Sequence, residues 1–242
     1  MRVFVPVVCA ACAFVGYPAT AQTFAANKPP VAGQSAAPQN AAPPVAHRVT
    51  GAIISFDGKV LTIRANSGER ITADVGPTSI VLFDEPRRMT DIHVGDFIGS
   101  AALLGADGKL HAQDVRIFPE TLRGMGEGQY PIGVDNPNRS MTNATVSEVT
   151  AASATAGTMK LTFHGSESSA AACSGHAAKD GKGCTGETLM TVVPGVPILA
   201  YTLGDRSSLI PGAAVSALVA PGPGGTWLAP RVLVEHNGIK PV

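Results

Sequence analysis

Two cysteines and two histidines are the residues whose types and spacing could do chemistry. Cys173 and Cys184 bound the stretch CSGHAAKDGKGC, His176 lies three residues after the first cysteine, and His164 precedes the stretch. Two thiolates and two imidazoles can form a tetrahedral zinc site or a copper site. The four residues therefore define one hypothesis, a metal-binding accessory protein, although their spacing matches no zinc finger or zinc knuckle.

The first residues of the chain predict the cellular compartment of the protein, and with it the redox conditions around these thiols. The stretch MRVFVPVVCAACAFVGYPATA (1–21) has a basic Arg2, an apolar run and a small-residue site that ends at Ala21. This order is typical of a secretory signal peptide. The apolar run is shorter than the roughly 20 residues that a membrane-spanning helix needs. We therefore predict cleavage after Ala21 and a periplasmic or secreted product with no integral membrane segment.

An exported protein meets oxidising conditions, in which neighbouring thiols usually pair. A Cys173–Cys184 disulfide would close a loop of about 12 residues and contribute roughly 3 kcal/mol at best. Redox sites prefer C-x-x-C, whereas ten residues separate these cysteines. The pattern favours a disulfide, with the metal site (His164, Cys173, His176 and Cys184) and free thiols as alternatives. Intact mass with and without reductant, together with elemental analysis, distinguishes them.

Composition and motifs exclude several classes of function. The chain has 18 basic and 18 acidic side chains, a formal net charge of +0, and loss of Arg2 with the signal peptide makes it −1. Such a chain lacks the cluster of basic residues that binding to nucleic acid or to an anionic membrane surface requires. It also has no nucleophile elbow, phosphate-cradling loop, HExxH or dinucleotide fingerprint. We therefore expect no catalytic residues and no cofactor.

The elements that must position the cysteine loop are short strands that follow a tether. Residues 22–47 are mostly Ala, Pro, Gln and Asn, a composition that cannot offset the entropy of ordering and predicts a disordered tether. From residue 48 on, short β-branched or alternating runs end at Gly, Asp, Asn or Pro turns. In the first half we predict strands at 49–55, 59–64, 69–75, 79–83, 97–104 and 109–118, with one helical turn within 84–96.

The second half repeats this order. Strands are predicted at 144–150, 159–165 and 188–193 and within 197–220 and 224–236, and Gly212 and Tyr201 correspond to Gly95 and Phe83. We predict an all-β fold of two tandem small β-barrel-like domains, of the OB or SH3 type, related by internal duplication. The predicted ranges are 48–118 and 142–238, with a loop insertion at 166–186 that carries the cysteines. One β-sandwich of about 190 residues is the alternative.

The connector at 119–141 joins the two predicted domains. The connector is rich in Gly, Pro and Asn, and this composition predicts that it lacks regular structure. The motifs Ile117–Glu120 (IFPE), Arg123–Gly128 (RGMGEG) and Met141–Val146 (MTNATV) occur here in that order. In these motifs the chain resembles a family of uncharacterised exported bacterial proteins with tandem small β domains. The resemblance implies architecture and compartment, and no established activity.

Three charged residues of the connector are candidates for a site: Glu120, Arg123 and Glu127. They could line a cleft between the domains, where pockets often form. Alternatively, Arg123 ties the connector to carbonyls or carboxylates and holds the domains in register. The second interpretation is favoured, because fixing the domain geometry suffices to explain these residues.

Aromatic residues are scarce, at 5% of the chain. Five of them fall within strand patterns and are predicted to be core: Phe83, Phe97, Phe118, Phe163 and Tyr201. The single tryptophan, Trp227, is predicted to pack at an edge or between the domains, and a role in ligand binding is the alternative.

Taken together, these features favour a noncatalytic periplasmic protein that binds or scaffolds an unknown periplasmic protein or small ligand. One alternative is the metal-binding accessory protein described above. Another is a small-ligand or glycan binder that uses the cleft between the domains.

Overall fold

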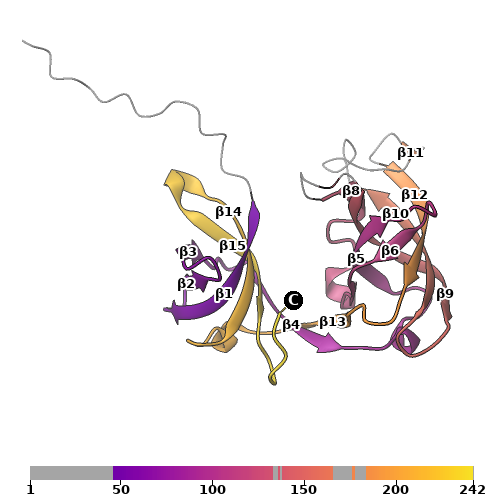
Figure 1. The fold of residues 1–242 in the computed structure, drawn as a ribbon. Helices are drawn as coiled ribbons and strands as arrows, with labels where there is room; N and C mark the ends of the chain where they lie inside the picture. The colour runs from indigo at the N-terminus through magenta and orange to yellow at the C-terminus, as the bar shows by residue number, and fades with distance from the viewer. Residues whose placement is uncertain (1–45, 133–135, 137, 166–175, 178–183, 242) are drawn as a thin grey trace, which may run out of the picture. The chain divides into compact units, whose positions relative to one another are not determined.

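The computed structural model describes residues 46–132, 136, 138–165, 176–177 and 184–241, all of which belong to one compact unit. Their regular structure consists of β-strands and short 3-10 helices (Figure 1). The expectation of an all-β fold is therefore confirmed. Among these residues, no helix has both the length and the apolar character needed to cross a membrane. The predicted signal peptide and nearly all of the predicted tether lie outside the described residues.

The strands of the first half follow the predicted order. They are β1 (His47–Phe56), β2 (Val60–Ala65), β3 (Arg70–Asp74), β4 (Ile80–Pro86), β5 (Phe97–Leu104), β6 (Leu110–Ala112) and β7 (Val115–Ile117), with a 3-10 turn η1 (Met89–Asp91) before β5. The turn between β1 and β2 forms because Asp57 Oδ1 accepts from the amides of Lys59 and Val60, at 2.9 and 2.7 Å. Gly58 supplies the φ of 96° that this turn needs.

The predicted strand at 109–118 is two strands, because Asp114 interrupts it. Asp114 Oδ1 accepts from the Ala101 amide at 2.8 Å, and its carbonyl accepts from Ser100 Oγ at 2.6 Å. The side chain thus replaces one bond of the ladder between strands. As a result β6 pairs with β12, whereas β7 pairs with β13.

The elements after β7 are more numerous than the sequence predicts. They are η2 (Glu120–Leu122), β8 (Gly128–Pro131), β9 (Arg139–Ala151), β10 (Gly157–Gly165), β11 (His176–Ala177), β12 (Cys184–Val192), β13 (Ile198–Leu203), η4 (Arg206–Ser208), β14 (Ala214–Pro221), η5 (Pro223–Gly225) and β15 (Trp227–Val234). The expectation that the connector lacks regular structure is wrong. Its β8 pairs with β9 from Gly128↔Asn143 to Pro131↔Ser140, which satisfies backbone groups that a loop would leave to water.

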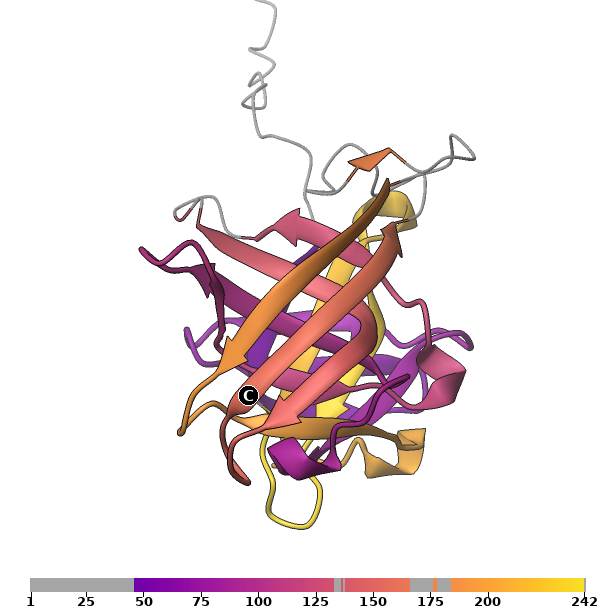
Figure 2. The ribbon, with the colours of Figure 1, turned by 90° about the vertical axis from the view of Figure 1, so that its right-hand side faces the viewer.

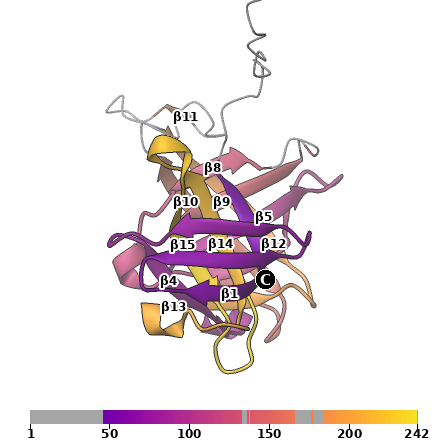
Figure 3. The same cartoon turned by 90° about the vertical axis from the view of Figure 1, so that its left-hand side faces the viewer.

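Five strands close a β-barrel. β1 pairs with β14 and β2, β2 with β3, β3 with β15 in parallel, and β15 with β14. Figure 3 faces this barrel, with β1 and β2 crossing in front of the yellow β14 and β15. Its first three strands come from the first predicted domain and its last two from the second.

A second set of five strands also forms a closed circuit of pairings. β9 pairs with β5 and β10, β10 with β12, β12 with β6 in parallel, and β6 with β5. Figure 2 faces β9, β10 and β12, which run diagonally across the view. Here three strands come from the second predicted domain and two from the first. The pairing therefore exchanges strands between the two predicted ranges.

The two circuits share two local features. The Gly95 amide donates to the Val146 carbonyl at 2.9 Å, and the Gly212 amide donates to the Ile53 carbonyl at 2.8 Å. A break in register occurs next to Ile53 in the β1–β2 pair and next to Val146 in the β9–β10 pair. The strands β4 and β13 pair with each other in antiparallel fashion and join the two circuits.

Each circuit encloses its own apolar core, and a third cluster lies at β4 and β13. The barrel core draws on β1–β3 and on β14 and β15, for example Leu61, Ile63, Ala217 and Val232. The third cluster combines three leucines with three aromatic residues. The rings of Phe97, Phe118 and Tyr201 pack edge to face, at centroid distances of 5.4 and 5.1 Å. Two members of this cluster, Phe118 and Tyr201, line the pocket described next.

Candidate functional site

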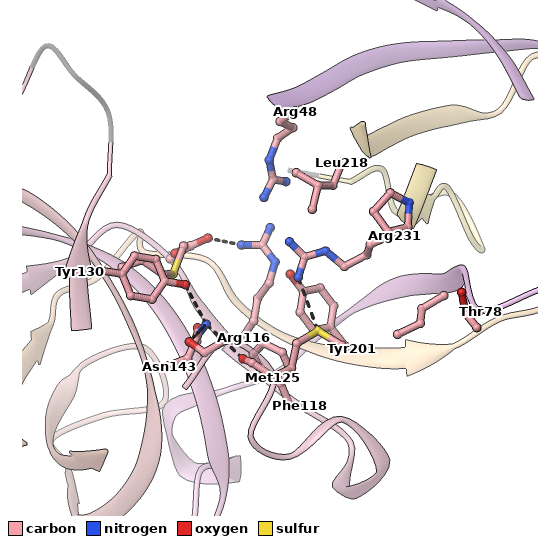
Figure 4. Close-up of a pocket in the computed structure, with 16 residues that line it drawn as sticks. Arg48, Thr78, Arg116, Phe118, Met125, Tyr130, Asn143, Tyr201, Leu218 and Arg231 are labelled. Atoms are coloured by element: carbon pink, nitrogen blue, oxygen red, sulfur yellow. Dashed lines mark hydrogen bonds and ion pairs between the residues drawn. The ribbon is translucent and has the colours of Figure 1, made fainter. Parts of the chain in front are cut away.

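A pocket of about 430 Å³ lies where strands of both closed circuits meet the connector. Its polar lining comprises Arg48 of β1, Asp114, Arg116 of β7, Tyr130 of β8, Asn143 of β9, Tyr201 of β13, Arg231 of β15 and Thr78. Its apolar lining comprises Ile80, Phe118, Met125, Met141, Leu218 and Pro230. Figure 4 shows that the guanidinium ends of Arg48, Arg116 and Arg231 point into one region from different strands.

Arg116 is the buried guanidinium of the three. It pairs with Asp114 and, through Nε at 3.4 Å, with Asp84 of β4, and it lies over the Tyr201 ring at 5.6 Å from the centroid. Burial opposes its charge, but Tyr201 and the carboxylates of Asp114 and Asp84 more than offset burial, so the pKa of Arg116 is raised. Arg116 therefore remains charged, and its two carboxylate partners hold it in place in the wall of the pocket.

Arg48 and Arg231 are bound far more weakly. Arg48 donates to Ser216 Oγ at 3.1 Å, and Arg231 contacts the thioether of Met125 at 3.8 Å. Among the described residues, neither has a carboxylate within ion-pair distance. A guanidinium carries five N–H donors, so most donors of these two side chains have no acceptor in the described part of the chain.

The guanidinium groups also repel one another. Burial lowers the pKa of Arg48, and the positive charges of Arg116 and Arg231 lower it further, although Tyr201 opposes them. A cluster of like charges next to apolar side chains is costly unless an opposite charge joins it. An anion that entered the pocket would relieve this repulsion.

Two tyrosines border the cluster. Burial raises the pKa of Tyr201, and Arg116 and Arg231 partly offset the rise. Burial also raises the pKa of Tyr130, against the opposing charge of Arg231. Both hydroxyls are therefore protonated at neutral pH. The Tyr130 oxygen accepts from Asn143 Nδ2 at 3.3 Å, which leaves its own O–H free to donate.

Asn143 fixes the connector against the pocket. Its Nδ2 donates to the carbonyls of Gly126 and Met125, at 2.9 and 3.3 Å, and the side chain is buried. Asn143 belongs to the MTNATV stretch, and Met125 and Gly126 belong to RGMGEG. The two motifs on which the family resemblance depends therefore contact each other here.

Gly99 of β5 makes room for this contact. A Cβ on Gly99 would lie 2.6 Å from Asn143 Oδ1 and 2.8 Å from the Phe118 ring. Both neighbours line the pocket, so any side chain here would displace its wall.

This lining is suited to binding and poorly suited to acid–base chemistry. Its described residues include one carboxylate, Asp114, which is paired with Arg116 and also bonds the Ala101 amide. General acid–base catalysis needs titratable groups that face the substrate and whose environments give them different pKa values. The arginines instead provide fixed positive charge and planar donors, which recognise anions.

The three predicted connector residues lie outside the lining. Arg123 pairs with both oxygens of Glu120, at 2.6 and 2.7 Å, and donates to the Gly95 carbonyl at 2.8 Å. Glu127 accepts from the His164 amide at 2.9 Å. These contacts connect η2 to the turn before β5, and the connector to β10. The pairing with Arg123 lowers the pKa of Glu120.

Most of the predicted cysteine and histidine cluster lies outside the described residues. Cys173 lies in the undescribed part of 166–186, and only the backbones of His176 and Cys184 are described, in β11 and β12. His164 is exposed at the end of β10. Among the described residues there is no group of three or more His, Cys, Asp or Glu side chains that could hold a metal ion. The Cys173–Cys184 disulfide and the four-residue metal site stay predictions.

The five aromatic residues predicted as core are all buried, which confirms that expectation. Two of them, Phe118 and Tyr201, also line the pocket. Trp227 is half-buried, with an edge-to-face contact to His47 at 5.1 Å.

Sequence reasoning missed the arginines and tyrosines of the pocket. One sequence feature could have identified Arg116: a charge between two apolar residues, Val115 and Ile117, in a strand. Arg48 and Arg231 lie 183 positions apart, and no local pattern links them.

No family model, no curated protein and no solved structure matches this chain. The resemblance of the connector motifs to the exported family stays a prediction.

Proposed function

We propose that this protein is a noncatalytic periplasmic binding protein that holds a small organic anion in the pocket of Arg48, Arg116 and Arg231. One observation carries the proposal. Arg48 and Arg231 point into a partly apolar pocket and have no carboxylate partner among the described residues. Charge-assisted bonds to an anion would satisfy their donors.

The size and lining of the pocket favour a small molecule over a polymer. Its volume of about 430 Å³ lies toward the lower end of the range of small-molecule sites. A neutral glycan would leave the guanidinium charges uncompensated. The periplasmic location depends on the predicted signal peptide, and a mature N-terminus at Gln22 in the periplasmic fraction tests it.

Replacement of Arg231 by Gln tests the proposal. The variant removes one unpaired charge and the fork of donors, whereas Arg70→Gln removes the same charge from an exposed position on β3. A panel of organic acids is screened by thermal shift, and binders are measured by calorimetry. We expect acids to raise the melting temperature of the unmodified protein and of Arg70→Gln, and affinity to fall at least about tenfold in Arg231→Gln.

Two results would contradict this function. One is that uncharged amides of the same acids stabilise the protein equally well. The other is that Arg231→Gln and Arg70→Gln bind the acids with equal affinity while both remain folded by circular dichroism.

We also propose that the two closed circuits arose by internal duplication and form two small barrels with exchanged strands. The matching amide bonds of Gly95 and Gly212 and the matching register breaks beside Ile53 and Val146 support this origin. A crystal structure in which those two breaks lay at non-equivalent positions would count against it.

A further inference from the structure

We infer that the ligand is a monocarboxylic acid with an apolar or aromatic body, whose carboxylate lies between Arg48 and Arg231. This inference rests on the proposed function and narrows it to one class of anion. It follows from the charge balance of the pocket and from the distribution of its apolar residues.

The charge balance favours one negative charge. The lining contributes three positively charged guanidinium groups. The carboxylates of Asp114 and of Asp84, which pairs with Arg116, contribute two negative charges, so the net charge is +1. One carboxylate reduces this sum to zero. A phosphate monoester carries about −1.5 to −2 at neutral pH and would leave an excess negative charge in the pocket.

The donors match a carboxylate in shape as well as charge. Guanidinium groups present planar forks that bind carboxylate oxygens in pairs. Arg116 already donates to the carboxylates of Asp114 and Asp84. The remaining guanidiniums are those of Arg48 and Arg231, which enter the pocket from β1 and β15 (Figure 4).

The rest of the pocket is suited to an apolar body. Phe118, Met125, Met141 and Leu218 line it together with the Tyr130 ring. Methionine side chains adapt to irregular shapes and contact aromatic rings favourably. The Tyr130 hydroxyl can donate one further bond to a polar substituent of that body.

Asp114 offers a test of the charge argument that is independent of the arginines. In Asp114→Asn the oxygen that accepts from the Ala101 amide can be retained, while the pocket charge rises from +1 to +2. We therefore expect this variant to shift preference toward dianions, and circular dichroism checks that it stays folded despite the weakened pair with Arg116.

Calorimetry with the full mature protein uses four probes. They are 3-phenylpropionate, its amide, acetate and phenyl phosphate. We expect 3-phenylpropionate to bind at least about tenfold more tightly than each of the other three, because only it supplies both a single charge and an apolar body. Arg48→Gln and Arg231→Gln should each lose that preference, and Arg70→Gln should keep it. Asp114→Asn should raise the affinity for phenyl phosphate relative to 3-phenylpropionate.

The outcomes separate this inference from the proposed function. If phenyl phosphate binds the unmodified protein more tightly than 3-phenylpropionate, the inference is wrong and anion binding stands. Acetate as tight as 3-phenylpropionate also refutes the inference, because the apolar body then contributes nothing. If no anion binds, or the amide binds equally well, both proposals fail. Circular dichroism of each variant shows whether a loss reflects unfolding, and Arg231→Lys, which keeps the charge, should recover part of the affinity.

Discussion

At the scale of single residues, the arginines of the pocket have different tasks. Arg116 is buried and pairs with Asp84 and Asp114, so its charge is used within the protein. A buried pair of this kind is costly to break from one side, by about 3–5 kcal/mol. Arg48 and Arg231 have weak partners and are available to a ligand. Replacing Arg116 would therefore test stability, whereas replacing Arg231 tests binding.

The tyrosines allow a prediction about pH. Of the three tyrosines in the chain, Tyr17 lies in the predicted signal peptide, and the predicted cleavage after Ala21 would leave Tyr130 and Tyr201. Burial raises the pKa of both. A raised folded-state pKa of a phenol means that stability is complete below the unfolded value of about 10 and is lost as pH rises from there toward the folded value.

Absorbance at 295 nm measures this directly. The titration midpoint of the folded mature protein should lie above 10, and in urea it should return to about 10. Tyr201→Phe should remove one of the two phenols from the signal. Identical midpoints in buffer and in urea would show that these hydroxyls are not buried.

At the scale of elements, the connector depends on Asn143. Its amide group bonds two connector carbonyls and the Tyr130 oxygen, and these contacts place β8 at the wall of the pocket. Asn143→Asp would replace the donors by a carboxylate that faces two carbonyls. We expect a loss of about 1–3 kcal/mol in unfolding free energy and faster amide exchange in 124–131.

The matched control is Asn66→Asp. Asn66 is exposed and bonds Thr50 through its amide group at 3.3 Å, so this change should alter the unfolding free energy little. Urea denaturation and hydrogen exchange followed by mass spectrometry provide the two measurements. Equal stability of the two variants would contradict the role assigned to Asn143.

At the scale of the whole molecule, each core combines residues from both predicted domains. In the barrel core, six of fifteen buried members lie in β14 and β15: Val215, Ala217, Val219, Ala229, Val232 and Val234. Strands β1–β3 without these partners would expose their apolar faces and two sheet edges. The predicted domain ranges of 48–118 and 142–238 should therefore not fold separately.

Two fragments test this expectation. Residues 46–118 alone should show no cooperative thermal transition, and a mixture of 46–118 with 119–242 should regain one. A cooperative transition of 46–118 alone would show that the strand exchange is unnecessary for folding.

The sequence by itself determined the class of fold, most strands, the turns and the buried aromatics, because these follow from local alternation and from residues such as Asp57 and Gly58. The tertiary structure decided which strands are neighbours. Alternation shows which face of a strand is buried and does not identify the partner strand, so the exchange of β14 and β15 with β5 and β6 left no trace in the pattern. The pocket follows from that exchange, because it brings Arg48 of β1 and Arg231 of β15 to Arg116 of β7.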